Sequence, residues 1–214
     1  MLTNSSIAQI GTGSPYSFVG FGETNFRGNH LNRAMGGIDV YIDSIHPNIN
    51  NPASYGVLKA TTYSVGINYR NNTLSNNLEN QKVASGAIDY IGVSIPTKRF
   101  GFGFGILPYS SVGYLLEDVT QVNQMEAINR FAGEGGINNA FLNFGFKISK
   151  GLNIGFTTNY GFGDITYRKT QTILGVENGT YFESNSSLSG INYKISANVS
   201  VPIKNLILQG LISF

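Results

Sequence analysis

The segment Phe100-Gly101-Phe102-Gly103-Phe104-Gly105-Ile106 decides the fold class of this chain. Successive side chains of a β-strand point to opposite faces, so one face of this segment carries only large apolar residues and the other only glycine. A soluble sheet buries its apolar face and exposes a polar one. A bulky aromatic face opposite a face of glycines instead suits a wall with lipid outside and a filled lumen inside.

The composition agrees with an outer-membrane β-barrel. Charged residues make up 12% of the 214 residues, whereas a soluble domain has about 25%. No stretch approaches the roughly 18 continuous apolar residues of a membrane helix. The net charge of +2 is too small to indicate nucleic-acid binding, and the absence of cysteine excludes a disulfide framework.

The same alternation recurs along the chain and predicts seven strands. They span residues 58–70, 83–96, 98–112, 137–149, 151–168, 186–202 and 205–214. In the second strand Asp89 has the parity of the outward apolar residues, and a β-bulge there would restore the pattern. Lys147 and Lys194 fall on the inward face, as expected because a lysine on the lipid face costs roughly 2–4 kcal/mol near the midplane.

The predicted connections alternate between short and long, as periplasmic turns and extracellular loops do. The long ones are residues 71–82, 113–136 and 169–185. Part of 113–136 has apolar residues at helical spacing, so this segment is either partly helical or an extended hairpin. Seven is an odd strand number, whereas bacterial single-chain barrels have even numbers, so we expect about half of a larger barrel. The alternative is a complete barrel of about 8 strands.

Three regions are expected. Residues 1–8 end in Ser6-Ile7-Ala8 and are typical of the end of a signal peptide, although an ordinary N-terminus would fit as well. Residues 9–56 are rich in Gly, Asn, Ser and Pro without a sustained period, which predicts an irregular segment, and the family resemblance given below implies that this segment is a hatch or plug. Residues 57–214 are predicted to form transmembrane β-barrel strands.

The order of these features resembles the N-terminal part of the long-chain fatty-acid and toluene transporter family (FadL/TodX-like), in its Bacteroidetes-type form. The matching motifs are Arg33-Ala-Met-Gly-Gly37, Asn51-Pro52-Ala53, the glycine-rich third strand that reaches Pro108, and the hairpin from Asn143 to Gly155. The resemblance implies an N-terminal hatch inside a larger barrel.

The resemblance also implies two sets of site residues. The hatch or gate would comprise Gly36, Gly37, Asn51, Pro52 and Ala53, and a lateral opening in the wall would comprise Gly103, Gly105 and Pro108. For both sets, the proline also has a purely structural explanation that needs no gate or opening. Pro52 restricts the residue before it and ends the irregular segment, and Pro108 marks a β-bulge because it lacks a ladder donor.

The remaining polar residues do not form a catalytic or metal-binding set. His30 and His46 are the only histidines, and without cysteine or a spaced carboxylate they are expected to be solvated or hydrogen-bonded rather than metal ligands. Glu117 and Asp118 are adjacent, so they point apart on a strand and make a poor acid–base pair. We therefore expect no enzyme activity, no metal and no cofactor.

The leading functional hypothesis is passive transport of hydrophobic small molecules across the outer membrane of a Gram-negative bacterium, in the manner of a porin or fatty-acid transporter. Its partners would be outer-membrane lipid and the hydrophobic ligand, and not nucleic acid. The alternative is a plugged barrel that serves as a structural or partner subunit of an outer-membrane, secretion-type assembly, together with other outer-membrane proteins.

Overall fold

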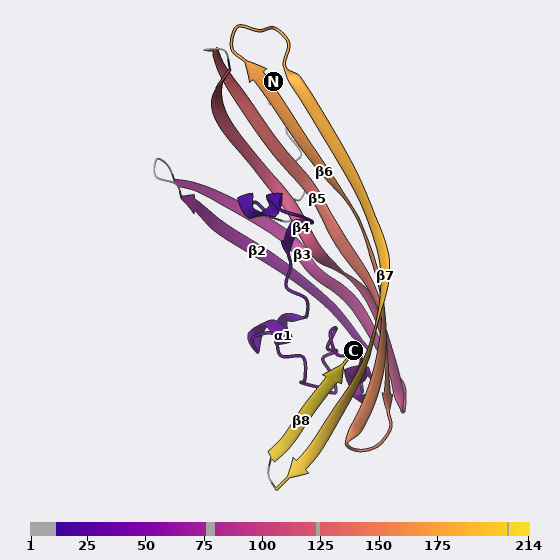
Figure 1. The fold of residues 1–214 in the computed structure, drawn as a ribbon. Coiled ribbons are helices and arrows are strands. Elements are labelled where there is room, and N and C mark those ends of the chain that lie inside the picture. The colour runs from indigo at the N-terminus through magenta and orange to yellow at the C-terminus, as the bar shows by residue number, and fades with distance from the viewer. Residues whose placement is uncertain (1–11, 76–79, 123–124, 205) are drawn as a thin grey trace, which may run out of the picture.

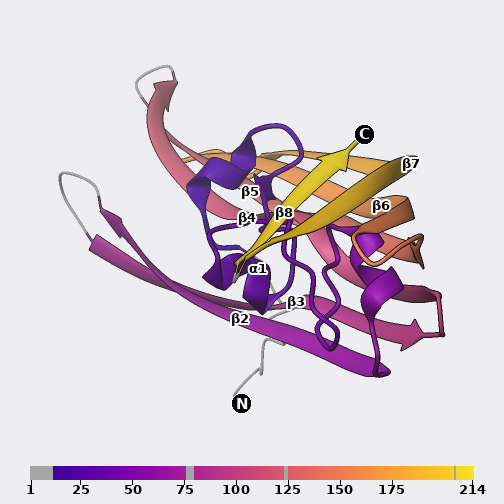
Figure 2. The same ribbon diagram turned by 90° about the horizontal axis from the view of Figure 1, so that it is seen from below.

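The computed structural model describes residues 12–75, 80–122, 125–204 and 206–214. Its main feature is one antiparallel sheet, in which seven strands neighbour one another in chain order. These strands are β2 (Thr62–Ser75), β3 (Asn80–Pro96), β4 (Phe100–Val122), β5 (Met125–Lys147), β6 (Leu152–Ile173), β7 (Thr180–Ile203) and β8 (Leu206–Ser213). The sheet curls around the N-terminal part of the chain (Figures 1 and 2), with β2 and β8 at the two ends of the strand order. The predicted all-β antiparallel fold is confirmed in the form of a curled half-barrel.

Several predicted segments fall on residues that the structure does not describe. The proposed signal-peptide remnant, residues 1–8, lies outside the described residues. The same holds for residues 76–79 and 123–124, which belong to two of the predicted long loops.

Most strands are longer than the alternation predicted, although β8 is slightly shorter. β4 continues to Val122 and β5 begins at Met125, so segment 113–136 is an extended hairpin and its helical alternative is wrong. Glu117 and Asp118 accordingly lie in β4 and not in a loop. The alternation fades in this hairpin because polar residues occupy both of its faces, although backbone pairing continues. Parts of the other predicted long loops, 71–82 and 169–185, also belong to strands.

A β-bulge restores the alternation of β3, as predicted. The register of β2 and β3 joins Gly66 to Tyr90 and Ile67 to Ile88, which leaves Asp89 as the extra residue. The Asp89 side chain is buried, with the guanidinium of Arg33 2.8 Å from its carboxylate and the side-chain amide of Asn68 donating to it. The bulge thus turns a carboxylate away from the outward apolar face and toward the interior of the curl.

Residues 12–61, which we call the N-terminal segment, lie on the concave face of the sheet (Figure 2). Its elements are short, namely η1 (Pro15–Phe18), β1 (Glu23–Thr24), α1 (His30–Ala34) and η2 (Pro52–Val57). β1 pairs with β4, while η2 packs against β4, β5, β6 and β7. The segment is therefore an irregular chain on the inside of the half-barrel and not a helical hatch. In the part of the chain described here, no helix has the length and apolar character needed to cross a membrane.

Candidate functional site

The convex face carries a band of exposed apolar side chains. On β6 the outward residues are apolar from Leu152 to Phe162, interrupted by Thr158, and on β7 they are apolar from Ile191 to Val201. Farther along the same face the side chains are charged. There Arg168 bridges Glu134 at 2.7 Å and Glu183 at 3.2 Å. The face therefore changes from apolar to ionic along the strands.

Inward-facing glycines form the floor on which Asn51-Pro52-Ala53 rests. A β-carbon on Gly145 would lie 2.5 Å from the Pro52 carbonyl oxygen, and one on Gly155 would lie 2.2 Å from the Ala53 backbone nitrogen. Asn51, Pro52 and Ala53 are all buried. Pro52 also begins η2, where its missing N–H has no helical partner to lose. The structure thus places all three predicted gate residues against the concave face.

Tyr55 closes the contact between η2 and the glycines of β4. Its side chain is 1% exposed, and a β-carbon on Gly103 would lie 2.3 Å from its ring. Burial raises the pKa of Tyr55 to about 12, although hydrogen bonds with Asn143 and Ser94 oppose the rise. No motif or residue spacing in the sequence indicates a role for Tyr55. The only sequence feature related to it is the glycine-rich stretch of β4 on which its ring packs.

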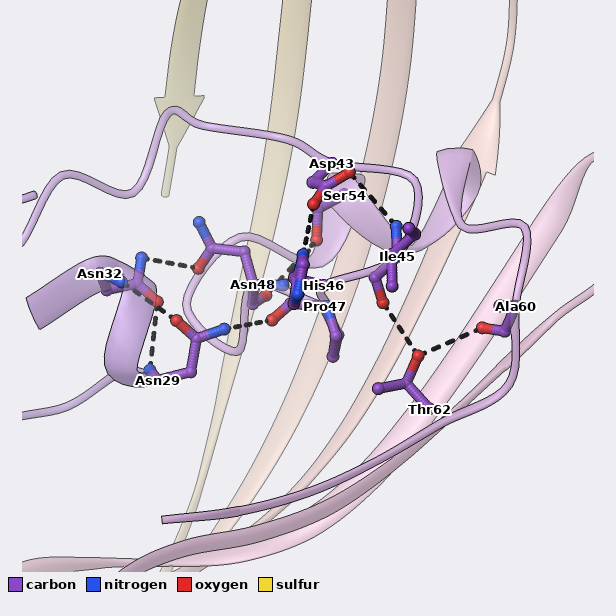
Figure 3. Close-up of polar contacts among 10 residues, drawn as sticks. All are labelled: Asn29, Asn32, Asp43, Ile45, His46, Pro47, Asn48, Ser54, Ala60 and Thr62. Carbon is purple, nitrogen blue, oxygen red and sulfur yellow. Dashed lines mark hydrogen bonds and ion pairs between the residues drawn. The ribbon is translucent and has the colours of Figure 1, made fainter. Parts of the chain in front are cut away.

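Buried asparagines hold the N-terminal segment together (Figure 3). Asn29 accepts a bond from the backbone nitrogen of Asn32 at 3.0 Å, and the Asn32 side chain accepts from the backbone nitrogen of Asn29 at 3.1 Å. Asn48 Nδ2 donates to the carbonyls of Asp39 at 2.9 Å and Tyr41 at 3.2 Å. Such bonds from side chains to the backbone fix a chain that has few regular elements of its own.

Gly36 and Gly37 are connected to the predicted gate motif through this network. Both have a positive φ, 70° and 87°, and the nitrogen of Gly37 donates to the carbonyl of Asn32 at 2.7 Å. The Asn32 side chain donates to the Asp39 carboxylate at 3.1 Å, and the Asp39 carbonyl accepts from Asn51 Nδ2 at 3.1 Å. Gly37 and Asn51 therefore belong to one hydrogen-bonded unit, and Gly36, Pro52 and Ala53 adjoin them in the chain.

Polar side chains on the concave face of the sheet bind this unit by donating hydrogen bonds to its backbone carbonyls. The bonds run from Lys194 to Asn50 at 2.7 Å, from Asn143 to Ile49 at 3.1 Å, and from Asn198 to Val40 at 3.0 Å. The alternation placed these three donors on the inward face, but it did not indicate what they bind. These bonds show that the concave face holds the N-terminal segment through amide and ammonium groups.

The two histidines approach each other, and each has a hydrogen-bond partner. His30 Nδ1 lies 3.1 Å from the Tyr90 hydroxyl, and His46 Nδ1 lies 2.5 Å from the Asp43 carboxylate. The ring centroids are 6.2 Å apart. The hydrogen bond with His46 holds the pKa of Asp43 below its usual value. Across the described ranges, no group of three His, Cys, Asp or Glu side chains could hold a metal ion.

A notch separates β3 from β4 near the predicted lateral opening. β3 pairs with β4 only over the stretch from Gly101 to Ile106, so Gly103 and Gly105 lie within the paired part and not in the notch. Pro108 lies just beyond that stretch, beside an irregularity at Tyr109, where the register with β5 shifts. β4 thus loses its neighbour on one side directly after Ile106.

The N-terminal segment enters this notch. β1 pairs with β4 there, and a cleft of about 1020 Å³ continues beyond it. Its walls include Leu74 and Val83 of the β2–β3 hairpin and Leu115 and Glu117 of β4. Tyr16 of the N-terminal segment also lines the cleft. The concave face is therefore filled by the chain's own backbone, and the notch is the place where the wall itself is interrupted.

Comparison with known proteins identifies a family. The model of the family described as BamG matches residues 1–210. No curated protein and no solved structure matches the chain. The expected membership of the FadL/TodX-like transporter family is therefore wrong, because the family that matches is a different one. The motifs that suggested this membership are explained by local packing. Pro52 starts a helical turn, and the glycines of β4 and β5 pack against the backbone of η2 and the ring of its Tyr55.

Proposed function

The chain belongs to the BamG family, and from this membership we propose that it is a partner subunit of the Bam assembly in the outer membrane of a Gram-negative bacterium. The observation that carries the proposal is the match of the family model over residues 1–210. It favours the hypothesis of an assembly subunit over that of a transporter of hydrophobic molecules. The role is structural and non-catalytic, with other outer-membrane proteins as partners.

The filled concave face supports a scaffolding role. η2 packs closely on β4, β5 and β6 through glycines that leave no room for a β-carbon, and Lys194, Asn143 and Asn198 bind the carbonyls of the N-terminal segment. A conduit would need this segment to move, which would break those bonds together. A plug that stays in place instead gives the curled sheet a rigid interior from which its outer surfaces can be presented to partners.

The convex face supports a membrane location. Its apolar stretch on β6, from Leu152 to Phe162, has about the 9–11 residues with which a tilted strand crosses the bilayer core. The ionic group around Arg168 would then stand outside the lipid. We extend the proposal to a transmembrane barrel that contacts lipid through this band and is closed by strands that pair with the edges at β2 and β8.

Affinity purification from native membranes tests the proposal. The full gene carries an affinity tag at its own chromosomal locus, membranes are extracted in mild detergent, and the eluate is separated on a native gel and identified by mass spectrometry. We expect Bam proteins to co-migrate with the tagged chain in a constant ratio. A tagged outer-membrane barrel of similar abundance serves as the control. Recovery of the chain without Bam proteins, or equal recovery of Bam proteins by the control, would contradict the proposal.

A further inference from the structure

The β3–β4 notch exposes one edge of β4 within an otherwise paired sheet. β5 pairs with β4 along its length, from Phe100 to Val122, whereas β3 pairs with it only as far as Ile106. Among the described residues, β1 is the only strand that pairs with the rest of this edge. An unpaired edge presents a row of backbone N–H and C=O groups that pair readily with another extended chain.

β1 shows how this edge binds an added strand. Glu23 pairs with Ser111 and Thr24 with Ser110, and the nitrogen of Asn25 donates to the Tyr109 carbonyl at 2.9 Å. The attachment is short, because β1 consists of two residues. Gly22 and Gly28 bracket it with φ values of 91° and 138°. The occupant is thus an extended backbone held by few bonds between two glycines.

The edge continues well beyond β1. Alternate residues of an antiparallel strand direct both backbone groups to the same side, so Leu115, Glu117, Val119 and Gln121 repeat the direction of Tyr109 and Ser111. The Leu115 side chain is 73% exposed, and the cleft of about 1020 Å³ runs beside this part of β4. Between β1 and this part of the edge, the Gly113 nitrogen already donates to the Ser17 hydroxyl at 3.1 Å. The acceptor edge from Tyr109 to Gln121 therefore extends, from Leu115 onward, beyond the part that the N-terminal segment covers.

We propose that the edge of β4 from Tyr109 to Gln121 is a strand-acceptor site, on which an extended segment of a partner polypeptide of the assembly replaces β1. The occupant is a polypeptide because the site offers backbone donors and acceptors in strand register, and because the chain's own β1 already uses them. This mode of recognition is strand addition, in which main-chain bonds supply the affinity. The inference rests on the proposed function for the identity of the partner, but not for the exchange of β1.

A disulfide lock tests the exchange without any partner. Thr24 and Ser110 are directly opposite each other, at the kind of non-hydrogen-bonded position where side chains come closest, and the chain has no native cysteine. The variant T24C/S110C can therefore be compared with itself in the oxidised and reduced states. The probe is a labelled synthetic peptide with the sequence of residues 17–27.

We expect the peptide to bind the reduced variant and the single variant T24C, and to bind the oxidised variant at least tenfold more weakly. Equal binding in both redox states would overturn the proposal, because the peptide would then bind elsewhere. Absence of binding to the reduced form would overturn it as well. A disulfide that does not form between these two positions would contradict the pairing of β1 with β4 on which the inference stands.

Backbone amide hydrogen exchange in the purified Bam assembly tests the partner. Exchange of the edge-facing amides of Leu115, Glu117, Val119 and Gln121 should slow at least tenfold between the isolated chain and the assembly, and this slowing should disappear when T24C/S110C is oxidised. If the assembly forms but exchange at these amides does not slow, the strand-acceptor site is overturned and the proposed function still stands. Failure of the assembly to form would instead contradict the proposed function, while the peptide experiment would still decide the exchange.

Discussion

The backbone nitrogen of Ala53 lies 2.2 Å from the position that a β-carbon on Gly155 would occupy. Real β-carbons do not approach other atoms so closely, so β6 and η2 can meet only because residue 155 is glycine. The opposing atom belongs to the backbone and cannot rotate away. The glycine is thus a condition for the seating of Asn51-Pro52-Ala53 on the sheet.

Replacing Gly155 with alanine should loosen the N-terminal segment. We expect Gly155→Ala to lower the free energy of unfolding by about 1–3 kcal/mol, the usual cost of overpacking. The measurement is the midpoint of urea unfolding in detergent, with tyrosine fluorescence as the signal that reports unfolding. Gly190→Ala in β7 is the matched control, because nothing lies within 4 Å of its added β-carbon. Equal losses in both variants would show that Gly155 acts through strand propensity and not through contact with Ala53.

Asn48 should stabilise the N-terminal segment mainly as a donor. Its Nδ2 satisfies the carbonyls of Asp39 and Tyr41, while its Oδ1 accepts from Asn32 and from the Asn50 nitrogen. Asn48→Asp keeps the acceptor and removes the donor, so the Tyr41 carbonyl loses this partner while the Asp39 carbonyl keeps its bond from Asn51 Nδ2. Each lost bond should cost about 0.5–1.5 kcal/mol. We expect limited proteolysis to cleave residues 12–61 faster in Asn48→Asp than in the wild-type chain.

The control for this variant is Asn50→Asp, on a less buried neighbour whose amide donates to the Arg27 carbonyl and to the Asp39 carboxylate. It makes the same chemical change without touching the Asp39 and Tyr41 carbonyls. Asn50→Asp also places a second carboxylate beside that of Asp39, so the decisive comparison is with the wild-type chain. Cleavage of Asn48→Asp no faster than that of the wild-type chain would show that Asn48 does not hold the two carbonyls.

The ionisation of Tyr55 should report whether η2 is seated on the sheet. Its pKa is raised from 10.0 to about 12 by burial. Because the folded-state pKa is above the unfolded value, the neutral phenol contributes stability that is fully present below pH 10. This contribution is lost as the pH rises from 10 toward 12.

An ultraviolet difference titration of the wild-type chain against Tyr55→Phe isolates this group among the 12 tyrosines. The difference signal should be centred well above pH 10 in the intact chain. It should move down toward pH 10 when Gly155→Ala is present in both members of the pair. A difference signal centred at pH 10 in the intact chain would contradict the buried position of Tyr55.

The alternation of side chains predicted the sheet wherever its two faces meet different environments. It located Phe100 to Ile106 correctly, and the misplaced parity of Asp89 correctly indicated a bulge. It left residues 113–136 undecided between a partly helical segment and the extended hairpin that the structure shows, because Glu117 and Arg130 belong to a stretch with polar groups on both faces. Strand pairing there depends on backbone groups, which leave no period in the sequence.

The candidate site was only partly accessible from the sequence for a related reason. Asn51-Pro52-Ala53 was recognisable as a motif, but its neighbours Gly155 and Lys194 come from distant positions that only the curl of the sheet brings together. The motif and the glycine-rich strand also misled the family assignment. Both arise wherever an irregular segment packs closely on an inward face of small residues, so they do not distinguish one family of plugged sheets from another.

A lysine scan of β7 should separate a lipid-facing band from the charged region beyond it. Ile195 lies on the convex face opposite Phe156, and Ser187 lies on the same face opposite Asp164. If the band contacts lipid, Ile195→Lys should destabilise the inserted protein by roughly 2–4 kcal/mol, whereas Ser187→Lys should cost only about 0–1 kcal/mol. Urea unfolding in phospholipid vesicles measures both values. The same variants in detergent micelles, which deform around a charge, should differ less. Equal costs at the two positions in vesicles would remove the support that the convex face gives to a membrane location, because a depth-dependent penalty is what lipid imposes and water does not.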